Sequence, residues 1–361
     1  MATIRDVAEA AGVSIATVSR VMNGTSRVSD PTRKRVEEAV AKLDYWPHGA
    51  ARSLTTSRTQ TVGVLLPDLH GQFFSEVIRG IDQGAREAGF HILVSSSHAE
   101  AETLLLGARA MSGRVDGLIV MAPDRETTRA IGALSRKFPV VLLNPHHPVE
   151  GCGTISVANF EGAVNVVALV IRNGHRSIGI VKGPKGNMDA EERLRGFRHA
   201  LERDGIEAVP AFEFPGDFSE ASGFMAGMEI ARMNPRPSAV FAANDCMAAG
   251  LLSAFRKADL DVPGDVTVVG FDDIPIAEFL TPRLTTVHVD ANALGRRAVS
   301  MLLTAVSDPH RAASRHEFLP VSIVVRQSCG TGHPSNGADG PVPPGPDASR
   351  PVAGPRGGFQ S

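Results

Sequence analysis

The segment from Ser14 to Arg20 carries side chains of the types that contact DNA. An arginine such as Arg20 donates two hydrogen bonds to the edge of a guanine in the major groove. The apolar groups of Ile15, Ala16 and Thr17 suit thymine methyl groups or the shape of the groove. Short polar side chains nearby suit phosphates, whose contacts fix the register of a protein on DNA. These side chains are Thr3, Ser14, Ser19 and Asn23.

Two helices and a turn must position those side chains. Thr3 and Asp6 have the spacing of a capping box, and apolar residues recur at helical spacing through residues 4–11. Gly12 supplies a turn, and Ser14 can cap a second helix over residues 15–22. The pattern predicts a helix-turn-helix that exposes the N-terminal end of its second helix to a partner. The spacing alone fits an ordinary pair of packed helices equally well.

A third helix and a short, weakly helical segment follow. Ser29 and the next two residues form a cap followed by proline, and apolar spacing continues to Leu43. Residues 45–55 contain Gly49 and β-branched threonines and are too few for a helix that is stable alone in water. We expect this segment to become ordered only on a partner.

At this point the chain resembles the lactose repressor (LacI/GalR) family of bacterial transcription factors. The motifs that carry the resemblance are Thr3-Ile4-Arg5-Asp6-Val7-Ala8, Gly12-Val13-Ser14, Thr17-Val18-Ser19-Arg20-Val21, Asn23-Gly24, Tyr45-x-Pro47 and Ala51-Arg52-Ser53-Leu54. In that family a hinge helix forms after the head when two subunits dock on DNA, and its leucine enters the minor groove. The resemblance implies that Leu54 is this wedge and that Tyr45 and His48 contact DNA. His48 stands where the family usually has asparagine.

Length, charge and cysteine usage fit a cytoplasmic regulator of several domains. The 361 residues exceed what one core supports, so we expect two or three units. Residues 1–60 contain nine Lys and Arg and six Asp and Glu, so their formal net charge is +3. The whole chain has a formal net charge of −2, so the remaining residues carry −5. The basic excess lies where DNA is expected.

Cys152, Cys246 and Cys329 are widely spaced, which indicates reduced thiols. No signal peptide or membrane-length apolar run is apparent.

From Thr61 onward, short β-branched runs alternate with helical patterns, which predicts parallel sheets covered by helices. A weak repeat of this pattern on either side of about Asn159 predicts two similar lobes. The fold class is therefore α/β, with a small all-α head and hinge followed by two doubly wound parallel-sheet lobes. The resemblance implies that these lobes are periplasmic-binding-protein-like. The expected strands are Thr61–Leu66, His91–Ser95, Gly117–Met121, Val140–Leu143, Thr154–Val157, Ile178–Val181, Ala239–Ala242 and Val266–Val269.

Polar and aromatic residues follow the ends of those strands, where ligands of such folds bind. Planar polar groups together with aromatic faces suit a sugar, although each polar residue alone could simply cap the next helix. The residues are Asp68, Met121, Asn144, Gly183, Asp217, Asn244-Asp245 and Asp272-Asp273, with Phe73, Phe74 and Phe218 nearby.

The resemblance extends to about residue 330, because this part looks like the family's effector-binding core. It implies that Arg193, Asn244 and Asp272, thought to come from separate loops, hydrogen-bond an effector. It also implies that Phe218 packs on the effector, as in sugar-binding members, and that Phe74 lines the pocket, as in the purine-binding member. Asn144 stands where several members have aspartate, so the ligand is not inherited from a known relative. The expected effector-binding residues are Phe73, Phe74, Met121, Asn144, Arg193, Phe218, Asn244 and Asp272.

The patterns and the resemblance together give the expected domain boundaries. We expect a DNA-binding head at 1–46, a hinge helix and linker at 47–59, an effector-binding and dimerisation core at 60–330, and a tail at 331–361. Lobe one should comprise about 60–158 plus 291–318, and lobe two about 159–290 plus 319–330. The tail has seven glycines and seven prolines among 31 residues and is expected to be disordered.

The resulting hypothesis is a homodimeric transcriptional repressor that binds an inverted-repeat operator and is controlled by a sugar-like effector. Purines, other metabolites and a protein co-effector stay open as alternatives. More remote alternatives are a cytosolic solute-binding protein and an enzyme on the same fold. The usual nucleotide, nucleophile and metalloprotease motifs are absent, so no catalytic residue, cofactor or metal is expected. His146-His147 has a metal-like composition but matches no metal-site spacing motif, and it is interpreted as a solvated loop.

Overall fold

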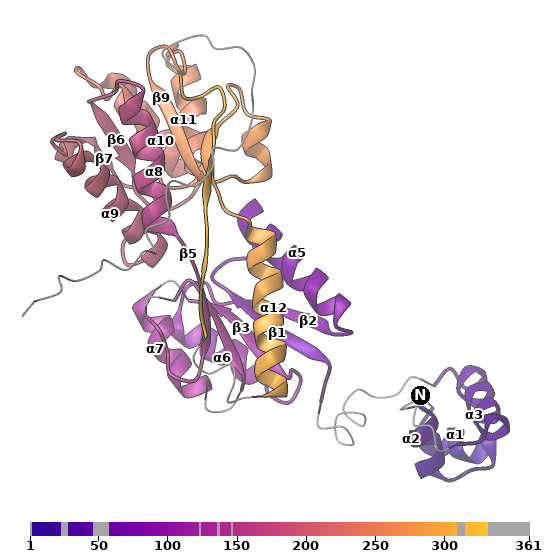
Figure 1. Cartoon of the computed structure of the whole chain (residues 1–361). Coiled ribbons are helices and arrows are strands. Elements are labelled where there is room, and N and C mark those ends of the chain that lie inside the picture. Colours follow the sequence, from indigo (N-terminus) through magenta and orange to yellow (C-terminus); the bar gives the residue numbers. More distant parts are fainter. Residues whose placement is uncertain are drawn as a thin grey trace, which may run out of the picture. The chain divides into compact units, whose positions relative to one another are not determined.

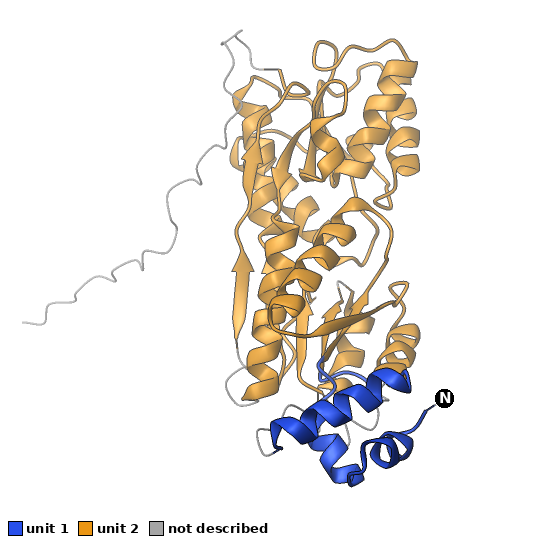
Figure 2. Cartoon of the chain, turned by 90° about the vertical axis from the view of Figure 1, so that its right-hand side faces the viewer, with its two compact units in different colours: residues 1–60, 113–116 blue, residues 61–112, 117–361 orange. Residues whose placement is uncertain are grey.

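The structure is a computed structural model, and its described residues are 2–22, 28–45, 58–122, 124–135, 138–145, 147–308 and 315–330. The chain divides into two compact units (Figure 2). One comprises residues 1–60 and 113–116, and the other comprises 61–112 and 117–361. Several predictions fall outside the described residues: the DNA contacts of Asn23, His48 and Leu54, most of the hinge, His146 and the tail.

The first unit contains the three predicted helices, α1 (Ile4–Ala11), α2 (Ile15–Met22) and α3 (Asp30–Lys42). Thr3 and Asp6 form the expected capping box at the start of α1, and Gly12 ends α1 with a positive φ of 62°. The Ser14 hydroxyl accepts a hydrogen bond from the Thr17 amide at 3.2 Å, as a cap for α2. The apolar faces of the three helices meet in one small core. The prediction of a three-helix head is confirmed.

The first lobe of the second unit is built on a six-stranded sheet in which all neighbouring strands are parallel. Its order is β11-β5-β4-β3-β1-β2. The strands are β1 (Thr61–Leu66), β2 (His91–Ser96), β3 (Gly117–Met121), β4 (Val140–Leu143), β5 (Gly153–Val157) and β11 (His316–Leu319). The helices are α5 (Gln72–Glu87), α6 (Ala101–Met111), α7 (Arg125–Leu134) and α12 (Ala291–Ser307). Helix α12 packs against α5 and across β3, β4 and β5.

The second lobe has a second sheet, in the order β12-β10-β9-β8-β6-β7, with only β12 antiparallel to its neighbour. The strands are β6 (Ile178–Val181), β7 (Glu213–Phe214), β8 (Ala239–Ala242), β9 (Thr267–Asp272), β10 (Thr285–His288) and β12 (Ser322–Val324). The α-helices are α8 (Asn159–Arg172), α9 (Met188–Arg203), α10 (Glu220–Arg232) and α11 (Asp245–Lys257). Short 3-10 turns span Pro210–Phe212 (η1) and Pro275–Glu278 (η2).

The chain passes between the lobes three times (Figure 1). It does so after β5, after β10 and between β11 and β12. The central strands β3, β4, β8 and β9 are fully buried, which agrees with the continuous apolar sequences of β3, β4 and β8. The α/β class with two parallel-sheet lobes is confirmed, and all eight expected strands are present. The sequence did not predict β7, β10, β11 and β12.

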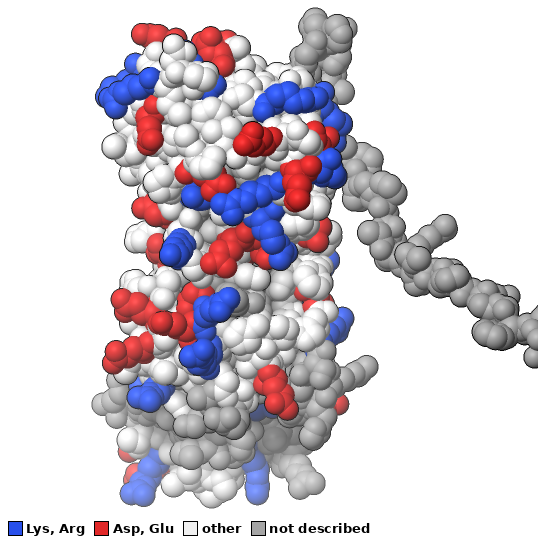
Figure 3. Space-filling view, turned by 90° about the vertical axis from the view of Figure 1, so that its left-hand side faces the viewer, with Lys and Arg blue, Asp and Glu red and all other residues white. Residues whose placement is uncertain are grey.

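The surface of the core carries charges of both signs. On the face in Figure 3, Lys and Arg side chains are interspersed with Asp and Glu side chains. Within the described ranges, no helix is long and apolar enough to cross a membrane.

Candidate functional site

A cavity of about 600 Å³ lies between the two lobes of the core. Lobe one contributes Pro67, Asp68, His70, Gly71, Gln72, Phe73, Phe74, His98, Ala99 and Met121. Lobe two contributes Pro184, Asn187, Asp189, Arg193, Asp217, Phe218, Ser219, Glu220, Asn244, Cys246, Asp272 and Ile274. The ends of β1, β3, β8 and β9 lead into this set, as expected where parallel strands end.

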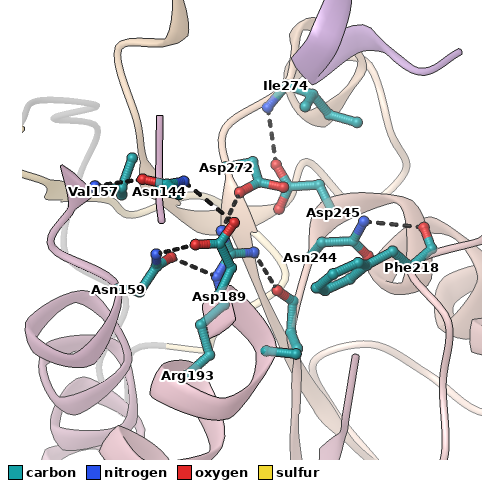
Figure 4. Close-up of polar contacts among 12 residues, drawn as sticks. Asn144, Val157, Asn159, Asp189, Arg193, Phe218, Asn244, Asp245, Asp272 and Ile274 are labelled. Carbon is teal, nitrogen blue, oxygen red and sulfur yellow. Dashed lines mark hydrogen bonds and ion pairs between the residues drawn. The ribbon is translucent and has the colours of Figure 1, made fainter. Parts of the chain in front are cut away.

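A buried ion pair between Arg193 and Asp272 forms part of the cavity wall (Figure 4). Arg193 Nη2 donates to Asp272 Oδ1 at 2.9 Å, and the two side chains are 6% and 8% exposed. Its Nη1 donates to the Ala243 carbonyl at 2.6 Å, and the guanidinium lies 3.8 Å from the centre of the Phe271 ring. Burial raises the pKa of Asp272 to about 6, although the Arg193 charge acts in the opposite direction. The guanidinium is thus already neutralised by the protein.

Asp189 is another buried carboxylate that lines the cavity. Its Oδ1 accepts a hydrogen bond from Asn159 Nδ2 at 2.8 Å, and its Oδ2 accepts one from Asn144 Nδ2 at 3.2 Å. Asn159 also accepts from Arg193 Nε at 2.8 Å, so the two charged groups share this amide. Burial raises the pKa of Asp189, and the Arg193 charge opposes that rise.

Two hydrogen bonds join the lobes beside the cavity. One is the Asn144–Asp189 bond, because Asn144 follows β4 in lobe one and Asp189 belongs to α9 in lobe two. The other runs from the Ile276 amide to Gln72 Oε1 at 2.8 Å. A change in how the lobes close must alter both bonds.

Asn244 holds an aromatic ring at the cavity. Its Oδ1 caps α11 by accepting from the Met247 amide at 2.9 Å, and its Nδ2 donates to the Phe218 carbonyl at 3.0 Å. Phe218 has a φ of +72°, which is uncommon for a residue with a side chain. The Asn244 amide thus supports the backbone that presents this ring to the cavity.

The two neighbouring aspartates Asp272 and Asp273, at the end of β9, have different surroundings. Asp272 lines the cavity, whereas Asp273 accepts from Arg326 Nη1 at 2.7 Å and contacts His288 Nδ1 at 2.9 Å. The His288 and Arg326 partners hold the pKa of Asp273 below its usual value despite burial. Neighbouring Asp245 is buried and accepts from Thr286 Oγ1 at 2.6 Å. Burial, followed by the Asp272 charge, raises its pKa well above the usual value.

The structure brings together most of the residues predicted to bind an effector. Seven of the eight line the cavity, namely Phe73, Phe74, Met121, Arg193, Phe218, Asn244 and Asp272. Asn144 does not line it but holds Asp189. Arg193 lies on α9 and not on a loop, which corrects the expected placement. Sequence reasoning missed Asp189, although it stands four residues before Arg193 and therefore on the same face of one helix.

The DNA-contact residues predicted in the head have different degrees of exposure. Ser14, Ile15, Ala16 and Arg20 are exposed, and Thr17 and Ser19 are partly buried. Thr3 is exposed, and its hydroxyl bonds the Asp6 carboxylate at 2.9 Å. Tyr45 is only 7% exposed and packs in the core of the head. Its ring therefore has a packing role that the sequence interpretation did not include. No group of three potential metal ligands occurs in the part of the chain that the structure describes.

Comparisons with known proteins match both parts of the chain. Residues 3–48 match the model of bacterial regulatory proteins of the lacI family, and residues 167–329 match a periplasmic binding protein-like domain. The ribose operon repressor of Escherichia coli (strain K12) is 34% identical over 325 residues, which cover 89% of this chain and 98% of that repressor.

Two further similarities cover the same length. The HTH-type transcriptional repressor PurR of Photobacterium profundum is 35% identical over 333 residues, or 91% of this chain and 98% of PurR. A Lac repressor dimer bound to operator and the anti-inducer ONPF superimposes with a TM-score of 0.82 at 32% identity, covering 91% of this chain and 99% of that one. Because these similarities span the head and both lobes, the chain belongs to the LacI family of bacterial regulatory proteins.

Proposed function

We propose that this protein is a transcriptional repressor whose affinity for operator DNA is controlled by a small molecule bound between the lobes of its core. The observation that carries the proposal is the cavity that both lobes line, in a chain whose head is a helix-turn-helix. A ligand that contacts both lobes has different contacts when they open or close, and such a difference is what shifts a conformational equilibrium.

The effector that fits this cavity best is an uncharged sugar or sugar derivative. Asp189 and Asp272 are acceptors when ionised, and they suit ligand hydroxyl groups. Phe73, Phe74 and Phe218 offer apolar faces for the C–H groups of a ring. Among the lining residues, the single guanidinium is paired with Asp272, which disfavours a phosphorylated sugar. A purine is the second candidate, because the aromatic rings also suit a planar base.

We propose that Ile15, Ala16, Thr17 and Arg20 of α2 read bases, the first three from its first turn and Arg20 from its last turn. Thr3, Ser14, Ser19 and Asn23 are proposed phosphate contacts, and Tyr45, His48 and Leu54 are proposed contacts around the hinge. The operator-bound dimer of the similar Lac repressor supports a homodimer on an inverted repeat. The proposal places the protein in the cytoplasm, on the nucleoid when it is bound to operator, and assigns it no enzymatic activity.

The test is a titration of operator binding in the presence of candidate effectors. Inverted-repeat DNA is first selected from random duplexes with the full chain, and its affinity is then measured with D-ribose, D-glucose, cellobiose or hypoxanthine. One of these compounds should change operator affinity, typically 5- to 150-fold, and ligand affinity must change by the same factor with DNA. Failure to select any preferred duplex would contradict the function.

Asp272→Asn is the variant that ties this response to the cavity. An asparagine keeps an oxygen for Arg193, whereas alanine would leave a buried guanidinium unpaired, at a cost of about 3 to 5 kcal/mol. The variant should bind operator within a few-fold of wild type but lose most of the response to the effector. A full response would remove Asp272 from the effector site.

A further inference from the structure

The Asp116 carboxylate binds the backbone of Thr59 and Gln60, just before the first strand of the core, and we call these contacts the clamp. Asp116 Oδ1 accepts hydrogen bonds from the Thr59 amide at 2.6 Å and from the Thr59 hydroxyl at 2.9 Å. Asp116 Oδ2 accepts one from the Gln60 amide at 2.9 Å. One side chain thus fixes two consecutive peptide groups that lie more than 50 residues away in sequence. Hydrogen bonds to an ionised carboxylate are stronger than those between neutral groups.

The clamp joins two points at which the chain passes from one compact unit to the other. Gln60 directly precedes β1, and Asp116 directly precedes β3. These strands are parallel neighbours, with Val62 paired to Gly117. Gln60 has a φ of +52°, which costs free energy and persists only where the surroundings enforce it. The Gln60 amide bond to Asp116 provides such enforcement.

The same two strands lead to the cavity at their other ends. β1 is followed by Pro67 and Asp68, and β3 ends at Met121, all of which line the cavity. The segment that leads back to the DNA-binding head begins immediately before Thr59. A movement of β1 against β3 at the cavity therefore reaches, at the opposite ends of the strands, the residue that holds this segment.

We infer that Asp116 is a positioning residue for operator recognition. It fixes the direction in which the segment leading to the head leaves β1, and so the spacing between the two heads of a dimer. The inference rests on the proposed function. A single head needs only its own surface to bind a half-site, whereas an inverted repeat requires both heads at one spacing. Releasing the clamp lowers the effective concentration of the second head at its half-site.

The experiment compares Asp116→Asn with wild type on two duplexes, the inverted repeat selected with the wild-type chain and a single half-site cut from it. Asp116→Asn should lose about tenfold or more in affinity for the inverted repeat and less than about twofold for the half-site. Hydrogen exchange of the Thr59 and Gln60 amides in the full chain should become faster. Thr59→Ala, which removes only the hydroxyl donor, should give a smaller loss of the same kind.

Asp124→Asn is the matched control. Asp124 also accepts a backbone hydrogen bond, from the Thr127 amide at 2.8 Å at the start of α7, and does not line the cavity. It should leave both DNA affinities and the two amides unchanged. Unchanged affinity of Asp116→Asn for the inverted repeat, or equal losses on both duplexes, would overturn the role of Asp116. If Asp116→Asn does not fold, Thr59→Ala decides by the same two criteria. A wild-type chain that prefers no duplex contradicts the proposed function instead.

Discussion

Asn144 and Asp189 form one of the two hydrogen bonds that join the lobes, and exchanging these two residues tests the geometry beside the cavity. In Asn144→Asp, a second carboxylate would face Asp189 Oδ2 at the 3.2 Å that now separates donor and acceptor. Two unit charges at that distance repel by about 5 kcal/mol at an effective dielectric constant of about 20. Side-chain movement and partial protonation relieve part of this, so we expect a loss of roughly 2 to 4 kcal/mol near pH 8. For a core of this size, that loss lowers Tm by roughly 5 to 10 °C.

The double variant Asn144→Asp, Asp189→Asn should recover most of the lost stability. An aspartate at 144 still accepts from the Val157 amide, which now bonds Asn144 Oδ1 at 2.8 Å. An asparagine at 189 still accepts from Asn159 and donates to the new carboxylate, so every bond of the pair has an equivalent. The single variant should also approach wild type near pH 5, because a raised folded-state pKa favours the protonated folded form as pH falls.

Thermal unfolding of the three proteins, which are wild type, Asn144→Asp and the exchanged pair, near pH 8 and pH 5 provides the measurement. Wild type and the exchanged pair should agree within about 3 °C at both pH values, a difference of roughly 1 kcal/mol. If Asn144→Asp alone melts like wild type near pH 8, the side chains at 144 and 189 are not in contact, and the hydrogen bond assigned between Asn144 and Asp189 is refuted. If the exchanged pair is no better than the single variant, the loss has another cause.

Three other predictions concern DNA and packing. Arg20→Ala should cost about 1 to 3 kcal/mol on the selected operator and much less on random DNA in gel-shift titrations, and equal losses would refute base readout. Leu54→Ala should leave the melting of the head unchanged but reduce operator bending, measured by fluorescence transfer between labelled DNA ends; unaltered bending removes the wedge role. Gly223→Ala should destabilise the core by about 1 to 3 kcal/mol in urea unfolding, because a methyl group there would overlap the Met247 backbone where α10 packs on α11. A neutral result would show that these helices can separate at little cost.

The strands that the sequence predicted are those whose own residues are enough to identify them. β3, β4 and β8 are continuous apolar runs, because they lie inside parallel sheets and are covered on both faces. β11 has mostly exposed or half-buried residues and exists by pairing with β5, for example His316 with Thr154. β7 has only two residues. Such strands depend on partners far away in sequence, which local patterns do not contain.

For the cavity, the prediction from sequence was limited because sequence does not define the direction of a side chain. The end of β4 places Asn144 beside the cavity, through its bond to Asp189, but sequence position does not define where its amide points. With a φ of +46°, Asn144 directs its oxygen to the Val157 amide and its nitrogen to Asp189. The residue that follows β4 thus carries an amide, and α9 supplies the carboxylate opposite it. The carboxylate of this contact therefore belongs to lobe two, and a ligand donor that binds Asp189 shares that carboxylate with the hydrogen bond that ties lobe two to lobe one.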